Sequence, residues 1–311
     1  MKKVAIIYGG PGDEHEVSVS SYKNILENID SKKFDVVSVF VNKNLGFEIN
    51  GKIFSEADGI NEIKKLNIDV VFPIIHGEYG EDGQLQEKLE DVGLKFVGHS
   101  SKVSAITIDK NKTNKVLKDN GINIPESKII NENNFSIHFS FPIIVKPTEG
   151  GSSVDLFKFE SEEEFKNSLN KIFKNHNEML AQEFIKGREF TCGVIEINKI
   201  VTPLVASEII LTKGSLFDYE AKYTQGGCIE VTPAEISDEL SNKIKETALS
   251  CHKILDCRSI SRTDMILKDD KLYVLEINTV PGMTKTSFIP QQAKVCGYEM
   301  KELITMLIEN I

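Results

Sequence analysis

Two apolar segments near the C-terminal end flank a short charged turn, and this pattern constrains the fold more than any other part of the sequence. Residues 259–267 and 272–278 favour β-strands, and the four residues 268–271 between them are a turn signal. A hairpin with a three-residue turn would place Lys268 opposite Leu272. The same register places two further pairs on one face of the hairpin, namely Asp264 with Glu276 and Arg262 with Asn278.

Three of these four side chains offer oxygen atoms. Asp264, Glu276 and Asn278 would form an all-oxygen site of the kind that suits magnesium. A buried carboxylate is costly unless it is paired or bound to a metal ion. The alternative is an ordinary edge strand whose polar residues face water. A register shifted by one residue would scatter the four side chains, so the hypothesis depends on the pairing.

The N-terminal part of the chain has the pattern of an α/β fold with a parallel sheet. Three apolar runs, at 4–8, 36–41 and 70–75, are typical of strands that are buried on both faces. The segment 17–29 between the first two runs is expected to be a helix.

The loop after the first run is rich in glycine but does not match a dinucleotide-binding fingerprint. Its glycine spacing differs, and Asp13, Glu14 and Glu16 follow at the expected start of the helix, where a phosphate would be repelled. The three acids would instead hold a cation such as a substrate ammonium group. The alternative is that they only stabilise the first turn of the helix.

A second glycine-rich loop, at residues 76–83, directly follows the third apolar run. Loops at the carboxyl ends of parallel strands often carry function, and three glycines permit tight backbone geometry. The alternative is a flexible acidic turn.

A lysine and a cluster of small residues in the middle of the chain suggest a phosphate site. Lys146 ends the apolar run 141–147, and the loop that follows contains Gly150, Gly151 and Ser152. The lysine would supply charge, and the loop would supply backbone N–H donors. The glycine-lysine-serine ending of a P-loop is absent. The alternative is a lysine at the surface beside an ordinary hairpin.

Charge and composition exclude several classes of function. The net charge of the 311-residue chain is -10, and no long basic run is present, which argues against nucleic acids and anionic membranes as partners. No apolar stretch reaches the length of a membrane span. The five cysteines do not have zinc-knuckle spacing. The N-terminus has no signal-peptide pattern, so we expect a cytoplasmic protein.

The remaining periodicity predicts further elements. Helices are expected over 84–92, 104–120, 162–174 and 238–255, and strands over 179–185, 190–197 and 200–205. The segment 216–223 mixes aromatic and charged residues without periodicity, as in a loop or lid.

These motifs together resemble the D-alanine–D-alanine ligases, which have the ATP-grasp fold. The similarity lies in residues 9–20, 76–90, 146–154, 183–191, 217–223, 261–264 and 275–290, in the family's order and over nearly the whole length. The resemblance implies a mixed α/β fold in which a Rossmann-like domain with a parallel sheet, residues 1–98, precedes two α+β subdomains that clamp ATP, residues 99–185 and 186–311.

The resemblance also implies a role for individual residues in binding ATP. Lys110, Lys146 and Lys222 would contact the phosphates, and Ser152 and Ser153 would close over them. Glu183, Phe184 and Ile185 would line the adenine pocket, and Glu189 would bind the ribose. Asp264, Glu276 and Asn278 would hold two Mg²⁺ ions, or Mn²⁺ in their place.

Two D-alanine molecules would be joined for peptidoglycan synthesis. Glu14 would bind the ammonium group of the first, with His76 nearby, and Ser287 and Phe288 would contact the second. Arg262 and the backbone N–H of Gly282 would stabilise the oxyanion. Tyr223 and Ser152 would link to Glu14 through hydrogen bonds, and the segment 214–227 would close over the site. A homodimer is implied as well.

Some positions depart from the family pattern, and two other functions stay open. Asp155 stands where the pattern has glycine, which adds negative charge beside the phosphate loop. The second substrate could be D-serine or D-lactate, although Tyr223 favours the dipeptide over the D-lactate ester. A regulator that binds nucleotides without catalysis is the alternative from another class.

Overall fold

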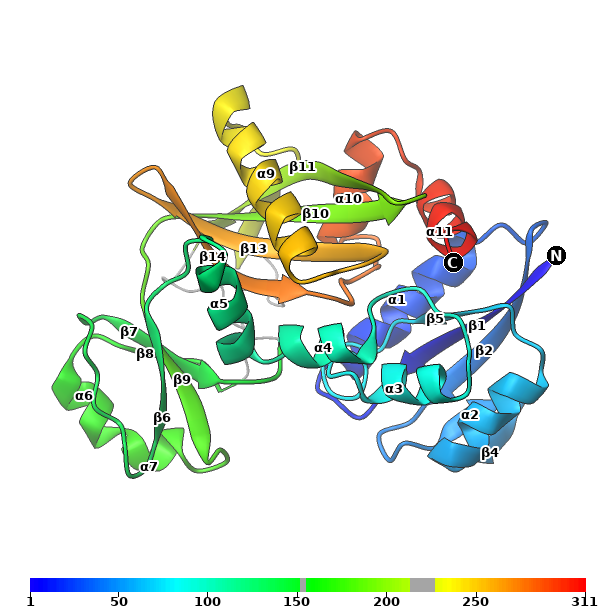
Figure 1. Ribbon diagram of the computed structural model, residues 1–311, viewed down its shortest axis with the longest axis horizontal. Coiled ribbons are helices and arrows are strands. Elements are labelled where there is room, and N and C mark those ends of the chain that lie inside the picture. Colours follow the sequence, from blue (N-terminus) through cyan, green and yellow to red (C-terminus); the bar gives the residue numbers. More distant parts are fainter. Residues whose placement is uncertain (152–154, 213–226) are drawn as a thin grey trace.

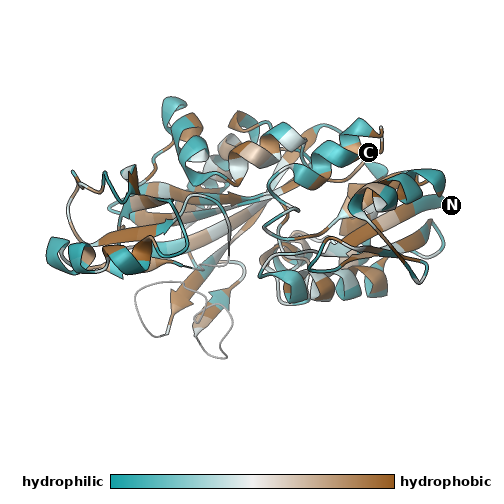
Figure 2. Ribbon diagram, turned by 90° about the horizontal axis from the view of Figure 1, so that it is seen from below, coloured by the Kyte–Doolittle hydropathy of each residue, from teal (hydrophilic) through white to brown (hydrophobic). Residues whose placement is uncertain are grey.

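The computed structural model describes residues 1–151, 155–212 and 227–311, which form three β-sheets with helices packed on them (Figure 1). Figure 2 shows that apolar residues are concentrated on the strands and on the helix faces turned toward them. No helix in the described ranges is long and apolar enough to cross a lipid bilayer.

The first sheet has the strand order β4-β3-β2-β1-β5. Its strands are β1 (Lys2–Gly9), β2 (Phe34–Val41), β3 (Phe47–Ile49), β4 (Lys52–Phe54) and β5 (Val70–Pro73). Both β2 and β5 pair with β1 in parallel, which confirms the predicted α/β pattern. The hairpin β3–β4 was not predicted, because three-residue strands give little periodic signal.

Both faces of the first sheet are buried. Val4 and Ile6 of β1 pack with α1 (His15–Asn28) and α11 (Met300–Glu309), whereas Ala5 and Ile7 face α2 (Glu56–Lys65) and α3 (Gln84–Asp91). The C-terminal helix therefore returns to cover the N-terminal sheet, and α1 and α11 lie together in Figure 1.

The second sheet is antiparallel, with the order β6-β9-β7-β8. It consists of β6 (Ser127–Asn131), β7 (Ile143–Pro147), β8 (Phe157–Phe159) and β9 (Glu178–Glu183), and it packs on α6 (Glu162–Asn167) and α7 (Leu169–Ile172). The single helix expected over 162–174 is thus two short helices divided at Ser168.

The third sheet has the order β12-β11-β10-β13-β14. Its strands are β10 (Arg188–Ile197), β11 (Ile200–Leu211), β12 (Cys228–Val231), β13 (Ile260–Lys268) and β14 (Lys271–Asn278). Helices α9 (Asp238–Ile254) and α10 (Phe288–Val295) pack on it.

The helix expected over 104–120 is also two helices, α4 (Ser101–Thr107) and α5 (Lys110–Asp119). The break falls at Asp109, whose carboxylate accepts hydrogen bonds from the backbone N–H groups of Asn111 and Lys112 and so caps α5. Val103 and Leu117 of these helices belong to the core of the third sheet. The domain boundaries at 98 and 185 remain our proposal.

The register of the β13–β14 hairpin corrects one prediction and confirms two. Lys268 pairs with Lys271 and not with Leu272, because the turn has two residues, Asp269 and Asp270, both with positive φ. A β-bulge then skips Leu275 and shifts the pairing by one residue. Beyond the bulge, the pairs Asp264–Glu276 and Arg262–Asn278 are those predicted.

Candidate active site

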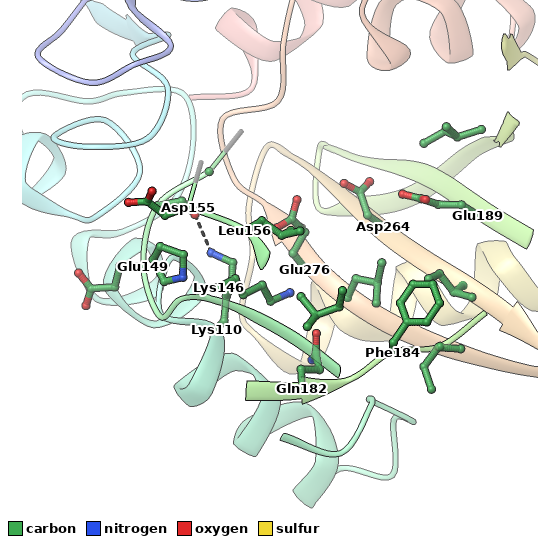
Figure 3. Close-up of a pocket in the computed structure, with 18 of the residues that line it drawn as sticks. Lys110, Lys146, Glu149, Asp155, Leu156, Gln182, Phe184, Glu189, Asp264 and Glu276 are labelled. Carbon is green, nitrogen blue, oxygen red and sulfur yellow. Dashed lines mark hydrogen bonds between the residues drawn. The ribbon is translucent and has the colours of Figure 1, made fainter. Parts of the chain in front are cut away.

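A cavity of about 740 Å³ lies between the second and third sheets and opens toward loops of the first. Its walls contain ten of the residues to which the family resemblance assigns a role: Glu14, His76, Lys110, Lys146, Glu183, Phe184, Ile185, Glu189, Asp264 and Glu276. Figure 3 shows the labelled lysines and carboxylates gathered around this space. The volume is within the usual range for a small-molecule site.

Asp264 is the centre of a hydrogen-bond network at the end of the cavity formed by the hairpin. Arg262 donates to both of its carboxylate oxygens, at 3.0 and 2.9 Å. Thr191 Oγ1 donates to Oδ1 at 2.5 Å, and Asn278 Nδ2 donates to Oδ2 at 3.1 Å. Burial lowers the pKa of Arg262, but the charge of Asp264 and its hydrogen bonds outweigh burial and raise this pKa above its ordinary value.

The hairpin residues fit a hard cation in their donor chemistry. Asp264 and Glu276 contribute carboxylates and Asn278 contributes an amide oxygen, the ligand types that Mg²⁺ prefers. Among the described residues, no three or more His, Cys, Asp or Glu side chains lie close enough together to hold a metal ion by themselves. The third ligand would therefore be the amide, and a metal ion at Asp264 would compete with Arg262.

The opposite wall carries the two lysines. Lys146 lies near the end of β7, and Lys110 is the first residue of α5. The Lys110 Nζ donates to the carbonyl oxygen of Gly150 at 2.6 Å, and its backbone N–H donates to Thr148 O at 2.9 Å. Helix α5 is thereby tied to the loop that follows β7.

Three consecutive residues at the end of β9 line the next part of the cavity wall. Glu183, Phe184 and Ile185 line it, and the Phe184 ring lies 4.2 Å from the Lys158 Nζ. Glu189 on β10 faces the same space. The neighbouring Gln182 also lines the cavity, although it was not predicted as a site residue from the sequence. It is 3 % exposed, and its Nε2 has no hydrogen-bond partner among the described residues. A polar residue within the apolar run 179–185 was the available signal.

His76 and Glu14 bring the first sheet into the site. His76 is buried, with Nδ1 2.7 Å from Val280 O and Nε2 3.3 Å from the Ser21 Oγ. Its Nδ1 is 3.9 Å from the carboxylate of Glu81, a residue to which the sequence assigned no role. Burial alone would lower the pKa of His76, but Glu81, together with the charge of Glu14, raises it above the ordinary value.

Glu14 lies close to the loop that follows β7. It precedes the first residue of α1, and a Cβ built on Gly151 would lie 3.0 Å from Glu14 Oε2. The carboxylate predicted to bind an ammonium group is therefore close to the glycine loop predicted to bind phosphate.

Five further predicted residues are not among those that line the cavity. Arg262 is 5.6 Å from the ring centre of Phe288, and Asn278 contacts Asp264. The Ser287 Oγ accepts a hydrogen bond from the Thr284 N–H at 3.1 Å, and a Cβ on Gly282 would lie 2.7 Å from this oxygen. Gly282 and Ser287 are thus packed together.

Four predicted residues, Ser152, Ser153, Lys222 and Tyr223, lie outside the described residues. The same is true of the proposed closing segment 214–227, apart from Gly227.

The two antiparallel sheets that enclose this cavity, together with a mixed N-terminal sheet in which β2, β1 and β5 are parallel, define an ATP-grasp fold. Among solved structures, the chain resembles the VanG D-Ala:D-Ser ligase from Enterococcus faecalis, with a TM-score of 0.86, 28% identity, and coverage of 99% of this chain and 98% of that one. It also resembles the D-alanine–D-alanine ligase from Bacillus anthracis, with a TM-score of 0.82, 30% identity, and coverage of 100% and 97%. A structure of the Bacillus anthracis enzyme complexed with ATP matches with a TM-score of 0.81 and 28% identity, covering 100% of this chain and 97% of that one.

Sequence comparison identifies the family. The model for the D-ala D-ala ligase C-terminus matches residues 109–309, and the model for the N-terminus matches residues 3–61 and 48–99. The D-alanine–D-alanine ligase of Leptospira biflexa is 36% identical over 99% of this chain and 98% of its own length. That of Clostridium beijerinckii is also 36% identical, with the same coverage. The chain belongs to the D-alanine–D-alanine ligase family.

Proposed function

We propose that this protein joins two D-alanine molecules into D-alanyl-D-alanine at the expense of ATP, for peptidoglycan synthesis. The observation that carries the proposal is the single cavity in which Lys110 and Lys146 face the same space as Asp264 and Glu276. Cations on one wall and carboxylates on the other suit a nucleotide whose phosphates are bound with a divalent metal ion. Family membership supports the same activity.

The proposed chemistry proceeds in two steps. A carboxylate is a poor electrophile, so the γ-phosphoryl group of ATP is first transferred to the carboxylate of one D-alanine, which gives an acylphosphate and ADP. The amine of the second D-alanine then attacks the acyl carbon and phosphate leaves. Lys110 and Lys146 would offset charge on the transferred group. Magnesium, held by Asp264, Glu276 and Asn278, would add to that stabilisation.

The substrates would occupy opposite sides of the reacting carbon. Glu14, near Gly151, would bind the ammonium group of the first D-alanine. Ser287 would bind the carboxylate of the second, and Arg262 with the Gly282 N–H would stabilise the tetrahedral oxyanion. The roles of Tyr223, Ser152, Ser153 and Lys222 rest on the family pattern in the sequence.

A second candidate substrate is D-serine. The VanG structure, which this chain matches with a TM-score of 0.86 and 28% identity, is that of a D-Ala:D-Ser ligase. D-lactate has less support, because the family pattern ties Tyr223 to the dipeptide. The regulator without catalysis has less support, because the sequence retains the whole set of proposed phosphate, oxyanion and metal residues, namely Lys146, Lys222, Arg262, Asp264, Glu276 and Asn278.

The deciding assay incubates the protein with ATP, Mg²⁺ and D-alanine, with and without D-serine or D-lactate, and identifies the product by mass. We expect D-alanyl-D-alanine. A mixed product formed in preference to it would favour the other ligase activity, and no ADP formation with any acceptor would favour the regulator.

The substitution Glu14→Gln tests the first-substrate site within the same assay. It should raise the KM for the first D-alanine and leave the KM for ATP near the wild-type value, since the lost charge faces the ammonium group. Glu16→Gln is the matched control, because Glu16 lies in the same turn and is exposed. An effect of Glu14→Gln on ATP alone would contradict the assignment.

We also propose a homodimer and a cytoplasmic location, as for an enzyme whose substrates are ATP and free amino acids. Light scattering of the purified protein tests the first, and cell fractionation tests the second.

A further inference from the structure

The loop between β7 and β8 is held at both of its ends, and the second attachment uses a residue that departs from the family pattern. At the first end, Lys110 binds the carbonyl groups of Thr148 and Gly150. At the second end, the Asp155 carboxylate lies 2.7 Å from the Nε2 of His176, which is in the segment between α7 and β9. Both Asp155 and His176 line the nucleotide cavity.

Asp155 is unusual in conformation as well as in charge. Its φ is +51°, in the left-handed region that glycine adopts most readily, so an aspartate here is held against a backbone preference. It also places a carboxylate in the wall of a cavity that is proposed to receive anionic phosphates. Two like charges in such a partly enclosed space repel each other unless a cation lies between them or beside one of them.

His176 supplies the compensation. Its imidazole is in hydrogen-bond contact with Asp155, and the two side chains are about equally shielded, with 31% and 33% of their surfaces exposed. An imidazole N–H that donates to the carboxylate spreads its charge.

We propose that His176 is a positioning residue for the nucleotide, which binds the Asp155 carboxylate and spreads its charge so that the cavity wall beside Gly150 and Gly151 can accept the ATP phosphates. The inference rests on the proposed function, because it assigns the phosphates to this side of the cavity. The proposal predicts different results for the loss of His176 and the loss of Asp155. Loss of His176 leaves a carboxylate with its charge uncompensated, whereas loss of Asp155 removes the need for His176.

The test compares His176→Ala, Asp155→Gly and the double variant by their steady-state kinetics. We expect His176→Ala to raise the KM for ATP roughly fivefold to tenfold, the scale of a partly shielded charged hydrogen bond, with kcat and the KM for D-alanine within about twofold. Asp155→Gly alone should lower the KM for ATP modestly, because it removes the carboxylate that repels the phosphates, and glycine suits the positive φ of this position. In the double variant, the KM for ATP should return to within about twofold of wild type.

The rescue distinguishes this role from a merely structural one. If His176 only stabilises the fold, Asp155→Gly cannot restore the KM for ATP in the His176→Ala background, and that result would overturn the inference. An unchanged KM in His176→Ala would overturn it too. His138→Ala is the matched control, because His138 is an exposed histidine between β6 and β7 that does not line the cavity. Thermal unfolding of each variant checks the fold.

Failure of the inference and failure of the proposed function give different results. Wild-type protein that forms ADP and dipeptide, with a KM for ATP that is insensitive to His176, sinks only the inference. Wild-type protein that forms neither product overturns the proposed function, and the assignment of His176 falls with it.

Discussion

The two walls of the cavity differ in how completely their polar groups are paired within the protein. On the β13–β14 wall, Asp264 receives hydrogen bonds from Arg262, Thr191 and Asn278. On the β7–β9 wall, the Nε2 of the buried Gln182 has no partner in the described part of the chain. A buried amide hydrogen without a partner is costly, so a site that keeps one is suited to a ligand that completes the bond.

The two walls therefore serve the reaction in different ways. On the hairpin wall, the Asp264 carboxylate is already oriented by Arg262, Thr191 and Asn278 in the free protein, as expected for a group that acts where charge develops in a transition state. On the β7–β9 wall, the Gln182 Nε2 is a donor without a partner in the described part of the chain, as expected where a ligand is bound and released. Substitutions on the first wall should therefore affect turnover, and those on the second should affect binding.

The largest expected effect is on the hairpin wall. Glu276→Gln keeps the size of the side chain but removes a carboxylate proposed to bind magnesium, so kcat should fall on the order of 10³-fold, the scale of several kcal/mol of lost stabilisation. Steady-state kinetics and Mn²⁺ binding followed by electron paramagnetic resonance would check this. Asp270→Asn at the tip of the same hairpin is the control, since asparagine tolerates the positive φ of that position. Turnover unchanged by Glu276→Gln would refute the ligand role.

The second effect concerns the attachment of the hairpin wall to the rest of the chain. His99 is buried, with Nε2 near Ile260 O at 2.9 Å and Thr279 O at 3.0 Å, while its Nδ1 accepts the Arg258 N–H at 3.0 Å. Burial lowers the pKa of His99 to about 4. The unfolded chain, with a histidine pKa of about 6.5, therefore binds more protons below that pH, and stability is lost as the pH falls.

His99 alone should cost about 2 kcal/mol of unfolding free energy between pH 7 and pH 5, and burial lowers the pKa of His252 to about 3, which adds a loss in the same direction. Urea unfolding at the two pH values measures the sum. His99→Gln should reduce the loss of stability by about 2 kcal/mol, whereas His138→Gln, at an exposed position, is the control. A difference between pH 7 and pH 5 that His99→Gln does not reduce would show that His99 is protonated in the folded protein.

The smallest expected effect is that of a substitution at Gln182, whose Nε2 has no partner among the described residues. Gln182→Leu removes the unpartnered amide, so the free protein should be as stable as wild type or about 1 kcal/mol more stable. The KM for ATP should nevertheless rise roughly fivefold, the equivalent of about one hydrogen bond, with the KM for D-alanine unchanged. Chemical unfolding and steady-state kinetics measure the two quantities. A variant that loses stability and keeps its affinity for ATP would show that Gln182 serves the fold.

The sequence predicted the hairpin wall better than the opposite wall, and the reason is physical. The alternation of side chains along paired strands fixes which residues share a face, so Asp264, Glu276, Arg262 and Asn278 could be placed together without coordinates. The contact between Asp155 and His176 joins two loops and has no period to reveal it. The break between α4 and α5 did have a signal in the capping residue Asp109, but helical periodicity on both sides concealed it.

The bulge at Leu275 has a consequence for how this hairpin can vary. Without it, the length of the turn at Asp269 and Asp270 would decide which side chains face the cavity, and one residue gained or lost at the tip would invert the site. The bulge shifts the pairing by one residue. This hairpin, with a two-residue turn and a bulge, therefore turns the same side chains toward the cavity as a hairpin with a three-residue turn and no bulge. The tip of the hairpin can therefore change in length during evolution or engineering, provided that the ladder takes up the difference before it reaches Glu276.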